Sequence, residues 1–157
     1  MRPRTSRPIT ISTSPEKNVS DRVFVDTVFV LALINPRDKY HRQAFELADQ
    51  FEGRPLVVTD AVLLEIGNAL ARGYKNEAIE IIDGFLASDE VEVVHLSPQL
   101  FDQAFTLYKQ YDDKEWSLVD CVSFVVMREV GVSQALTFDR HFTQAGFEPL
   151  IPESPYG

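Results

Sequence analysis

Short apolar runs alternate with longer helical segments after residue 21, and no other feature constrains the fold of this chain as strongly. Strands that alternate with helices favour a parallel sheet covered on both faces, because the crossover connections place helices there. The sequence therefore predicts one α/β domain. The expected strands are rich in β-branched residues and lie at 22–26, 55–60, 91–96 and 133–139, with 147–151 as a possible edge strand. The expected helices lie at 27–34, 38–53, 61–73, 75–88, 98–112, 115–131 and 140–146.

Charge is distributed unevenly along the 157 residues, whose formal net charge is −9. Residues 1–20 carry four basic side chains and one acid, a net charge of +3, which leaves −12 on residues 21–157. A domain with this negative charge binds nucleic acid poorly in general, because contacts between basic side chains and phosphates dominate the affinity for nucleic acid. A polyanionic substrate would need a local basic patch or a bound cation. We expect 1–20 to be a disordered N-terminal extension and 21–152 to form the domain.

Cysteine and histidine usage narrows the chemistry further. Cys121 is the only cysteine, so an internal disulfide is excluded, and its apolar neighbours predict a packing role in a protein of the reducing cytoplasm. His41, His95 and His141 stand far apart, which argues against a zinc site. No apolar run approaches the roughly 18 residues that a membrane span requires, so we expect no membrane association.

Asp120 is the most anomalous charge in the sequence. It lies near the start of a helix whose residues from Leu118 to Val130 are apolar on almost every side. Ser117 is positioned to cap this helix, which would place Asp120 at the third helical position, where the helix dipole favours a carboxylate. Capping alone would explain this acid, and a site shared with other acids would explain its apolar surroundings as well.

Three more acids occupy positions where a site would form. Asp26 and Asp139 each end an expected strand, and ligands of parallel α/β sheets collect beyond the carboxyl ends of the strands. Taken singly, each aspartate also fits an ordinary turn or helix cap. Glu65 lies in an expected helix and shares a face with Asn68, either towards solvent or lining a site.

A cluster of these carboxylates would favour a hard divalent cation. Neighbouring carboxylates raise one another's pKa unless a cation keeps them ionised. Oxygen ligands without cysteine or clustered histidine suit Mg²⁺ or Mn²⁺, and phosphodiester hydrolysis is the corresponding chemistry. The chain has no glycine-rich phosphate loop and no G-x-S-x-G motif. A dehalogenase-type phosphatase would need a second aspartate where this chain has Val28.

Four segments, "VFVDT", "EIGNAL", "WSLVDCVSF" and "ALTFDRHFTQAGF", together resemble the PIN-domain ribonucleases of the VapC toxin type over about residues 22–150. The resemblance implies a three-layer α/β/α sandwich with a central, mainly parallel sheet of four to five strands. It also implies an Mg²⁺- or Mn²⁺-dependent endoribonuclease. Position by position, its catalytic and metal-binding acids are Asp26, Glu65, Asp120 and Asp139, with Thr27, Asn68 and Ser117 as hydrogen-bonding neighbours.

Partners and substrate contacts follow from the same resemblance. Members of this family are usually held by a small antitoxin and tend to form homodimers, with RNA as the substrate. By position, Arg37, Lys39 and Arg140, with Arg42 and Lys114, are candidate contacts to the RNA backbone, although ordinary surface charge would also explain them.

Other readings stay open. Trp116 is expected to pack in the core, Tyr74 is a candidate for stacking on bases, and His141 is expected to be a surface or substrate-contact residue. An RNA-processing PIN nuclease without an antitoxin and a silent PIN-like binding scaffold are the alternative functions.

Overall fold

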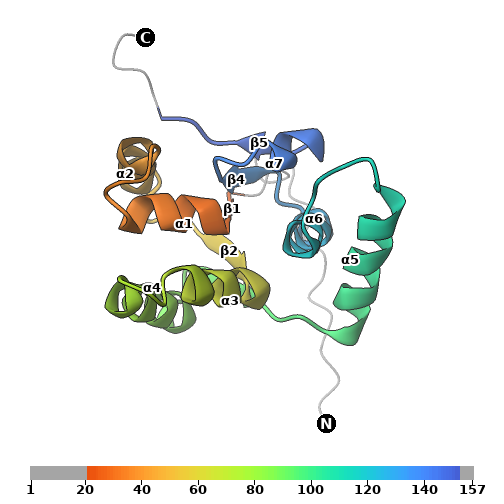
Figure 1. The fold of residues 1–157 in the computed structure, drawn as a ribbon, viewed down its shortest axis with the longest axis horizontal. Coiled ribbons are helices and arrows are strands. Elements are labelled where there is room, and N and C mark those ends of the chain that lie inside the picture. Colours follow the sequence, from red (N-terminus) through yellow and green to blue (C-terminus); the bar gives the residue numbers. More distant parts are fainter. Residues whose placement is uncertain (1–20, 153–157) are drawn as a thin grey trace, which may run out of the picture.

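The protein, seen in a computed structural model that describes residues 21–152, is an α/β/α sandwich (Figure 1). The predicted fold class is confirmed, and the extension predicted over 1–20 lies outside the described residues. The strands are β1 (Val23–Val25), β2 (Leu56–Thr59), β3 (Val91–Val94), β4 (Gln134–Leu136) and β5 (Glu148–Pro149). The helices are α1 (Thr27–Ile34), α2 (His41–Gln50), α3 (Asp60–Ala69), α4 (Lys75–Ala87), α5 (Pro98–Gln110), α6 (Leu118–Val130) and α7 (His141–Gln144).

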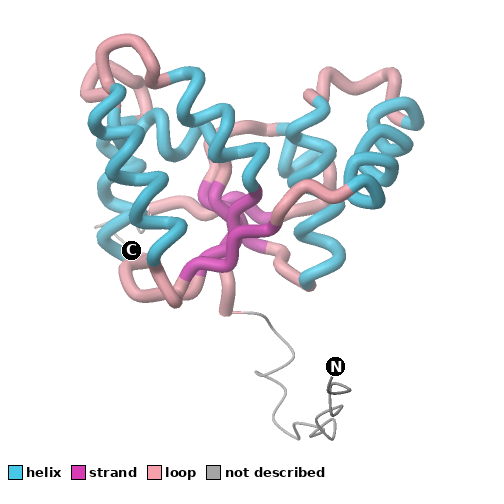
Figure 2. The backbone as a smooth tube through the Cα atoms, turned by 90° about the horizontal axis from the view of Figure 1, so that it is seen from below, coloured by secondary structure: helices cyan, strands magenta, loops and turns pink. Residues whose placement is uncertain are grey.

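The sheet is parallel throughout, with strand order β3-β2-β1-β4-β5, so β1 is its central strand. Helices α1 to α4 gather on one side of the strands and α5 and α6 on the other (Figure 1, Figure 2). In the register of β1 and β4, Val25 lies opposite Leu136. The residues that follow these two strands therefore meet at the same edge of the sheet.

Several elements are shorter than the sequence predicted. The helix expected from residue 38 begins only at His41, because the Asp38 carboxylate accepts a hydrogen bond from the backbone N–H of Tyr40 (2.8 Å) and holds a turn there. Asp60 was expected to end β2 but is the first residue of α3. Thr59 caps that helix, since its hydroxyl accepts from the N–H of Val62 (3.1 Å).

The core lies on both faces of the sheet. All three residues of β1 are buried, and α6 buries Cys121, Phe124 and Met127 completely, as its apolar composition predicted. Burial raises the pKa of the Cys121 thiol to about 11, which fits a packing role. Among the described residues, no helix has the length and apolar character needed to cross a membrane.

Trp116 packs in this core, as expected. Its ring meets Phe124 edge-on with the ring centroids 5.1 Å apart, and its indole N–H donates to the Gln144 side chain (2.9 Å). This contact joins the start of α6 to α7, the short helix that follows β4.

Candidate active site

Asp26 follows the central strand and is held by its neighbour β4. Its backbone N–H donates to the carbonyl of Leu136 (3.1 Å), which continues the sheet pairing by one residue. Its carboxylate accepts a hydrogen bond from the hydroxyl of Thr137 (2.8 Å), and only 4% of the residue is exposed. The carboxylate is thus fixed at the sheet edge and largely removed from water.

Asp139 lies beside Asp26 because the turn after β4 folds back on itself. The Thr137 hydroxyl that donates to Asp26 also accepts from the backbone N–H of Asp139 (3.0 Å). The N–H of His141 donates to the Asp139 carboxylate (2.9 Å) at the start of α7. Thr137 therefore links the two strand-end acids, and no local pattern in the sequence distinguishes it from other buried strand residues.

Glu65 enters the site from α3, which packs against α1. Its Oε1 accepts a hydrogen bond from the Thr27 hydroxyl (2.6 Å), so the first residue of α1 orients this carboxylate. Asn68, one helical turn further on, lines the same cavity. The side of α3 that carries Glu65 and Asn68 is therefore turned towards this cavity.

Asp120 forms a reciprocal cap at the start of α6. The Ser117 hydroxyl accepts from the N–H of Asp120 (3.0 Å), and the Asp120 carboxylate accepts from the N–H of Ser117 (3.0 Å). The predicted cap is confirmed, with Asp120 at the third helical position. The same carboxylate also faces the cavity, so the capping explanation and the shared-site explanation hold together.

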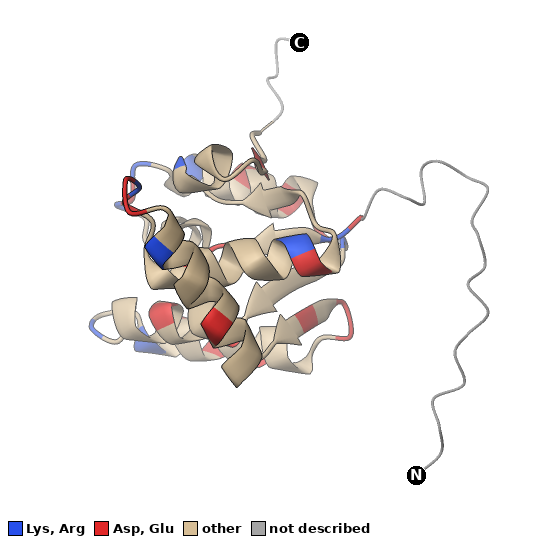
Figure 3. Ribbon diagram, turned by 90° about the vertical axis from the view of Figure 1, so that its right-hand side faces the viewer, with Lys and Arg blue, Asp and Glu red and all other residues tan. Residues whose placement is uncertain are grey.

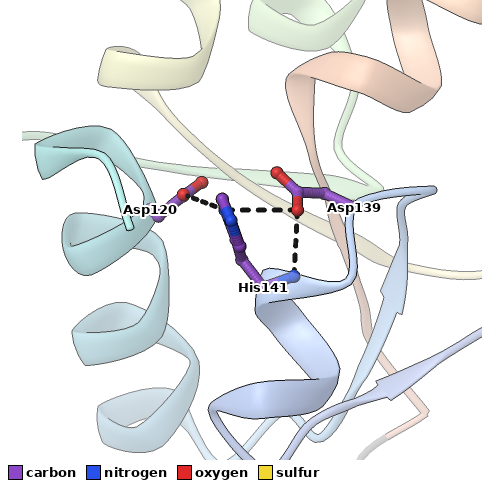
Figure 4. Close-up of side chains that lie close together, drawn as sticks. All are labelled: Asp120, Asp139 and His141. Atoms are coloured by element: carbon purple, nitrogen blue, oxygen red, sulfur yellow. Dashed lines mark hydrogen bonds and ion pairs between the residues drawn. The ribbon is translucent and has the colours of Figure 1, made fainter. Parts of the chain in front are cut away.

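His141 contacts two of the acids, which the sequence analysis did not predict. Its Nδ1 lies 3.0 Å from Oδ2 of Asp120 and 3.2 Å from Oδ1 of Asp139, and Figure 4 shows the ring between the two carboxylates. Only 18% of the side chain is exposed, so His141 is not a free surface residue, and the alternative expectation of a substrate contact stays a prediction. The available signal was its place two residues after a strand-end acid, at the start of a helix.

These side chains surround one cavity of about 620 Å³. All four predicted acids line it, together with His141 and with Glu115, which had not been predicted. The predicted hydrogen-bonding neighbours line it too: Thr27, Asn68 and Ser117.

The electrostatics of the cavity disfavour bare carboxylates. Burial raises the pKa of Asp26 from an ordinary 3.8 to about 7, and the charges of Asp120 and Asp139 add to the rise. Burial likewise raises the pKa of Asp120, aided by the charge of Asp139, and that of Glu65, aided by the charge of Asp120. A bound cation would reverse these shifts by stabilising the ionised forms.

The donor set fits a divalent cation. One ligand atom each from Asp120, Asp139 and His141 lie within 4.8 Å of one another, and the carboxylates of Asp26 and Glu65 line the same cavity. Carboxylate oxygens are the ligands that Mg²⁺ and Mn²⁺ prefer in proteins.

The predicted RNA contacts separate into two groups. Lys39 and Arg140 line a second cavity next to the first, here called the Lys39–Arg140 hollow, whose other walls include Tyr40 and Phe138. Arg37 lines neither cavity. Elsewhere the Lys and Arg residues of the described chain are scattered over helices and loops (Figure 3), and several are paired with acids, as Arg42 is with Glu46 (3.3 Å).

The chain is similar in sequence to two proteins of named activity. The chain is 36% identical over 133 residues to the 23S rRNA-specific endonuclease VapC20 of Mycobacterium tuberculosis, covering 83% of this chain and 99% of the relative. It is 28% identical over 113 residues to a VapC ribonuclease of Aquifex aeolicus, covering 70% and 79%.

Solved structures and a family model agree. The crystal structure of M. tuberculosis VapC20, described as a sarcin-ricin loop cleaving toxin, superposes with a TM-score of 0.75 at 34% identity, over 83% of this chain and 99% of that one. FitAcB from Neisseria gonorrhoeae, at 12% identity and a TM-score of 0.58 over 83% and 97%, shares the fold. The model of the PIN domain matches residues 23–148. The chain therefore belongs to the PIN-domain family, in its VapC branch.

Proposed function

We propose that this protein is an endoribonuclease that hydrolyses RNA phosphodiester bonds with Mg²⁺ or Mn²⁺, and that it is the toxin of a toxin–antitoxin pair. The observation that carries the proposal is the convergence of Asp26, Glu65, Asp120 and Asp139 on one cavity in a PIN-domain protein. RNA is the substrate named for the VapC relatives of this chain.

Asp26, Asp120 and Asp139 would hold the cation. When bound, a divalent cation lowers the pKa of water and neutralises charge that develops on the phosphoryl oxygens. The protein fixes these carboxylates beforehand: Thr137 positions Asp26 and Asp139, while Ser117 and His141 position Asp120. Such hydrogen bonds from neighbouring residues orient metal-binding carboxylates.

Glu65 is placed to accept a proton from the attacking water. Thr27 donates to its Oε1, which leaves Oε2 as the oxygen that can accept a proton. In the metal-free protein its pKa is raised by burial and by the charge of Asp120. A carboxylate at this position can act as a general base. Thr27 acts through Glu65 and is a positioning residue.

The cellular setting follows the relatives. The match to a structure described as a toxin supports a toxic role, and we infer a small antitoxin as partner and a homodimer as the working form. We further infer a cytoplasmic protein, which is consistent with a single, buried cysteine.

RNA cleavage by the purified protein tests the activity. We expect cleavage of RNA with Mg²⁺ or Mn²⁺, none in EDTA, and a loss of at least about 100-fold in Asp120→Asn, the effect of removing one preorganised electrostatic group. Asp102→Asn is the matched control, since Asp102 is exposed on α5. Equal activity in EDTA or in Asp120→Asn would contradict the metal-dependent mechanism, whereas no cleavage by the wild-type chain would favour a partner-binding scaffold.

Growth on expression tests the toxin assignment separately. Induction of the wild-type chain should arrest growth, Asp120→Asn should not, and a small protein encoded next to the gene should relieve the arrest. Cleavage without arrest would favour an RNA-processing nuclease.

A further inference from the structure

The Lys39–Arg140 hollow opens beside the acidic cavity and has a volume of about 620 Å³. The two cavities share Val28 and Asp139 as wall residues, so a polymer that reaches Asp139 from this side passes the hollow. Its other walls come from the connection between α1 and α2 and from the connection between β4 and α7.

Two stacked aromatic rings line the hollow. The rings of Tyr40 and Phe138 stack with centroids 4.5 Å apart and an interplanar angle of 7°, although the two residues are distant in sequence. Phe138 also contacts Phe29 of α1, with centroids 6.2 Å apart. The two connections therefore pack against each other through these rings.

Two cationic side chains line the same hollow. Lys39 places its Nζ 4.9 Å from the centroid of the Tyr40 ring, and Arg140 is exposed. Within residues 21–152, neither forms a salt bridge with a carboxylate. The acids on the same walls are engaged: Asp38 accepts from the N–H of Tyr40 (2.8 Å), and Asp139 accepts from the N–H of His141 (2.9 Å).

We propose that the Lys39–Arg140 hollow binds a backbone phosphate of the RNA next to the scissile phosphodiester. The inference rests on the proposed ribonuclease function and adds a substrate-binding site to it. Five carboxylates line the neighbouring cavity, and residues 21–157 carry a net charge of −12, so an RNA strand is repelled unless cations receive it close to the site. Lys39 and Arg140 are the cations that line a cavity sharing Asp139.

RNA explains this placement better than a protein partner does. An acidic peptide can pair with these cations anywhere on the surface and has no need of the acidic cavity, whereas an RNA strand must cross its rim to be cleaved. Arg37 lines neither cavity, so we assign no phosphate contact to it.

The salt dependence of RNA binding tests the proposal. Binding of a fluorescent single-stranded RNA is measured by anisotropy over a salt series, in a Glu65→Gln background that prevents turnover. Neutralising one phosphate contributes about 0.7 to the slope of log K against log salt for single strands. Lys39→Ala/Arg140→Ala should therefore lower the slope by about 0.7 and weaken binding at low salt, while Lys39→Arg/Arg140→Lys should retain the slope.

The control removes the same charge elsewhere. Lys75→Ala/Arg128→Ala deletes one exposed lysine and one exposed arginine that line neither cavity, and should leave the slope unchanged. A slope unaffected by Lys39→Ala/Arg140→Ala, or lowered equally by the control, would overturn the inference. So would unchanged RNA binding with weakened binding of the antitoxin. If the wild-type chain neither binds nor cleaves RNA, the proposed function itself fails.

Discussion

Asp26→Asn is expected to stabilise the metal-free protein while it abolishes cleavage. Asp26 is 4% exposed, and burial raises the pKa of its carboxyl from 3.8 to about 7. The amide of asparagine has nearly the same shape, and its Oδ1 can accept the hydrogen bond that Thr137 donates (2.8 Å). The substitution therefore removes a buried charge and retains the local contact.

The size and sign of the effect follow from proton linkage. In the unfolded chain Asp26 loses its proton near pH 3.8, whereas in the folded protein it keeps it until about pH 7. The contribution of Asp26 to the free energy of unfolding is therefore most favourable below pH 3.8, and it is lost as the pH rises through 7. The rise in the pKa of Asp26 from 3.8 to about 7 corresponds to about 4 kcal/mol of stability, at about 1.4 kcal/mol for each tenfold change in proton affinity. Asp120 and Glu65, whose pKa values are also raised, act in the same direction.

Urea unfolding in EDTA at several pH values measures this. The free energy of unfolding of the wild type should fall between about pH 4 and pH 8, with a slope of up to about 1.4 kcal/mol per pH unit from Asp26. The free energy of unfolding of Asp26→Asn should depend less on pH and should exceed that of the wild type at about pH 8. That of Asp102→Asn should stay within about 0.5 kcal/mol of the wild type. A variant no more stable than the wild type at about pH 8 would refute the reasoning.

Adding the cation to the same unfolding experiment tests whether it binds the folded protein. A ligand at about 100 times its Kd stabilises the folded state by about 2.7 kcal/mol. Mg²⁺ or Mn²⁺ should therefore stabilise the wild type and have much less effect on Asp26→Asn. Equal stabilisation of both proteins would remove Asp26 from the proposed metal ligands.

Two further substitutions address the residues that position the acids. Thr27→Val removes the hydrogen bond to Glu65 (2.6 Å) and should lower kcat by about 10- to 100-fold with little change in KM; an unchanged kcat would contradict the positioning role. His141→Ala removes the contacts at 3.0 and 3.2 Å to Asp120 and Asp139 and should weaken Mn²⁺ binding by about 10- to 100-fold in a calorimetric titration; unchanged affinity would show that the cap alone positions Asp120.

The sequence predicted the main elements of the fold because each is marked locally. Apolar runs, caps and glycines distinguish the strands from the helices, and the parallel-sheet rule places both strand-end aspartates at one edge. Strand ends were predicted less well. The strand expected at 133–139 ends at Leu136, because the Thr137 hydroxyl bonds to both Asp26 and the N–H of Asp139 as the chain turns towards α7.

The parts of the site that escaped prediction depend on contacts between distant segments. His141 reaches Asp120 only because α7 packs beside the start of α6, where Trp116 bonds to Gln144 (2.9 Å). No periodic pattern reports such a contact. The hydrogen bond from Thr137 to Asp26 spans 111 residues and is equally invisible to local patterns.

The two aspartates on the two sides of the cavity are stabilised by different means. Oδ2 of Asp120 accepts from the N–H of Ser117 and lies 3.0 Å from Nδ1 of His141, and both contacts lower its pKa against the effect of burial. The positive end of α6 adds to this stabilisation. Folding itself therefore fixes Asp120, and its Oδ1 is left for a ligand.

Asp26 has less support. Thr137 and the backbone at Thr27 lower its pKa, yet burial and two neighbouring carboxylates raise it to about 7. A cation would relieve this repulsion more than any side chain on these walls does. The stability cost of the site is thus concentrated at the end of the central strand, so Asp26→Asn, more than Asp120→Asn, should separate stability from activity.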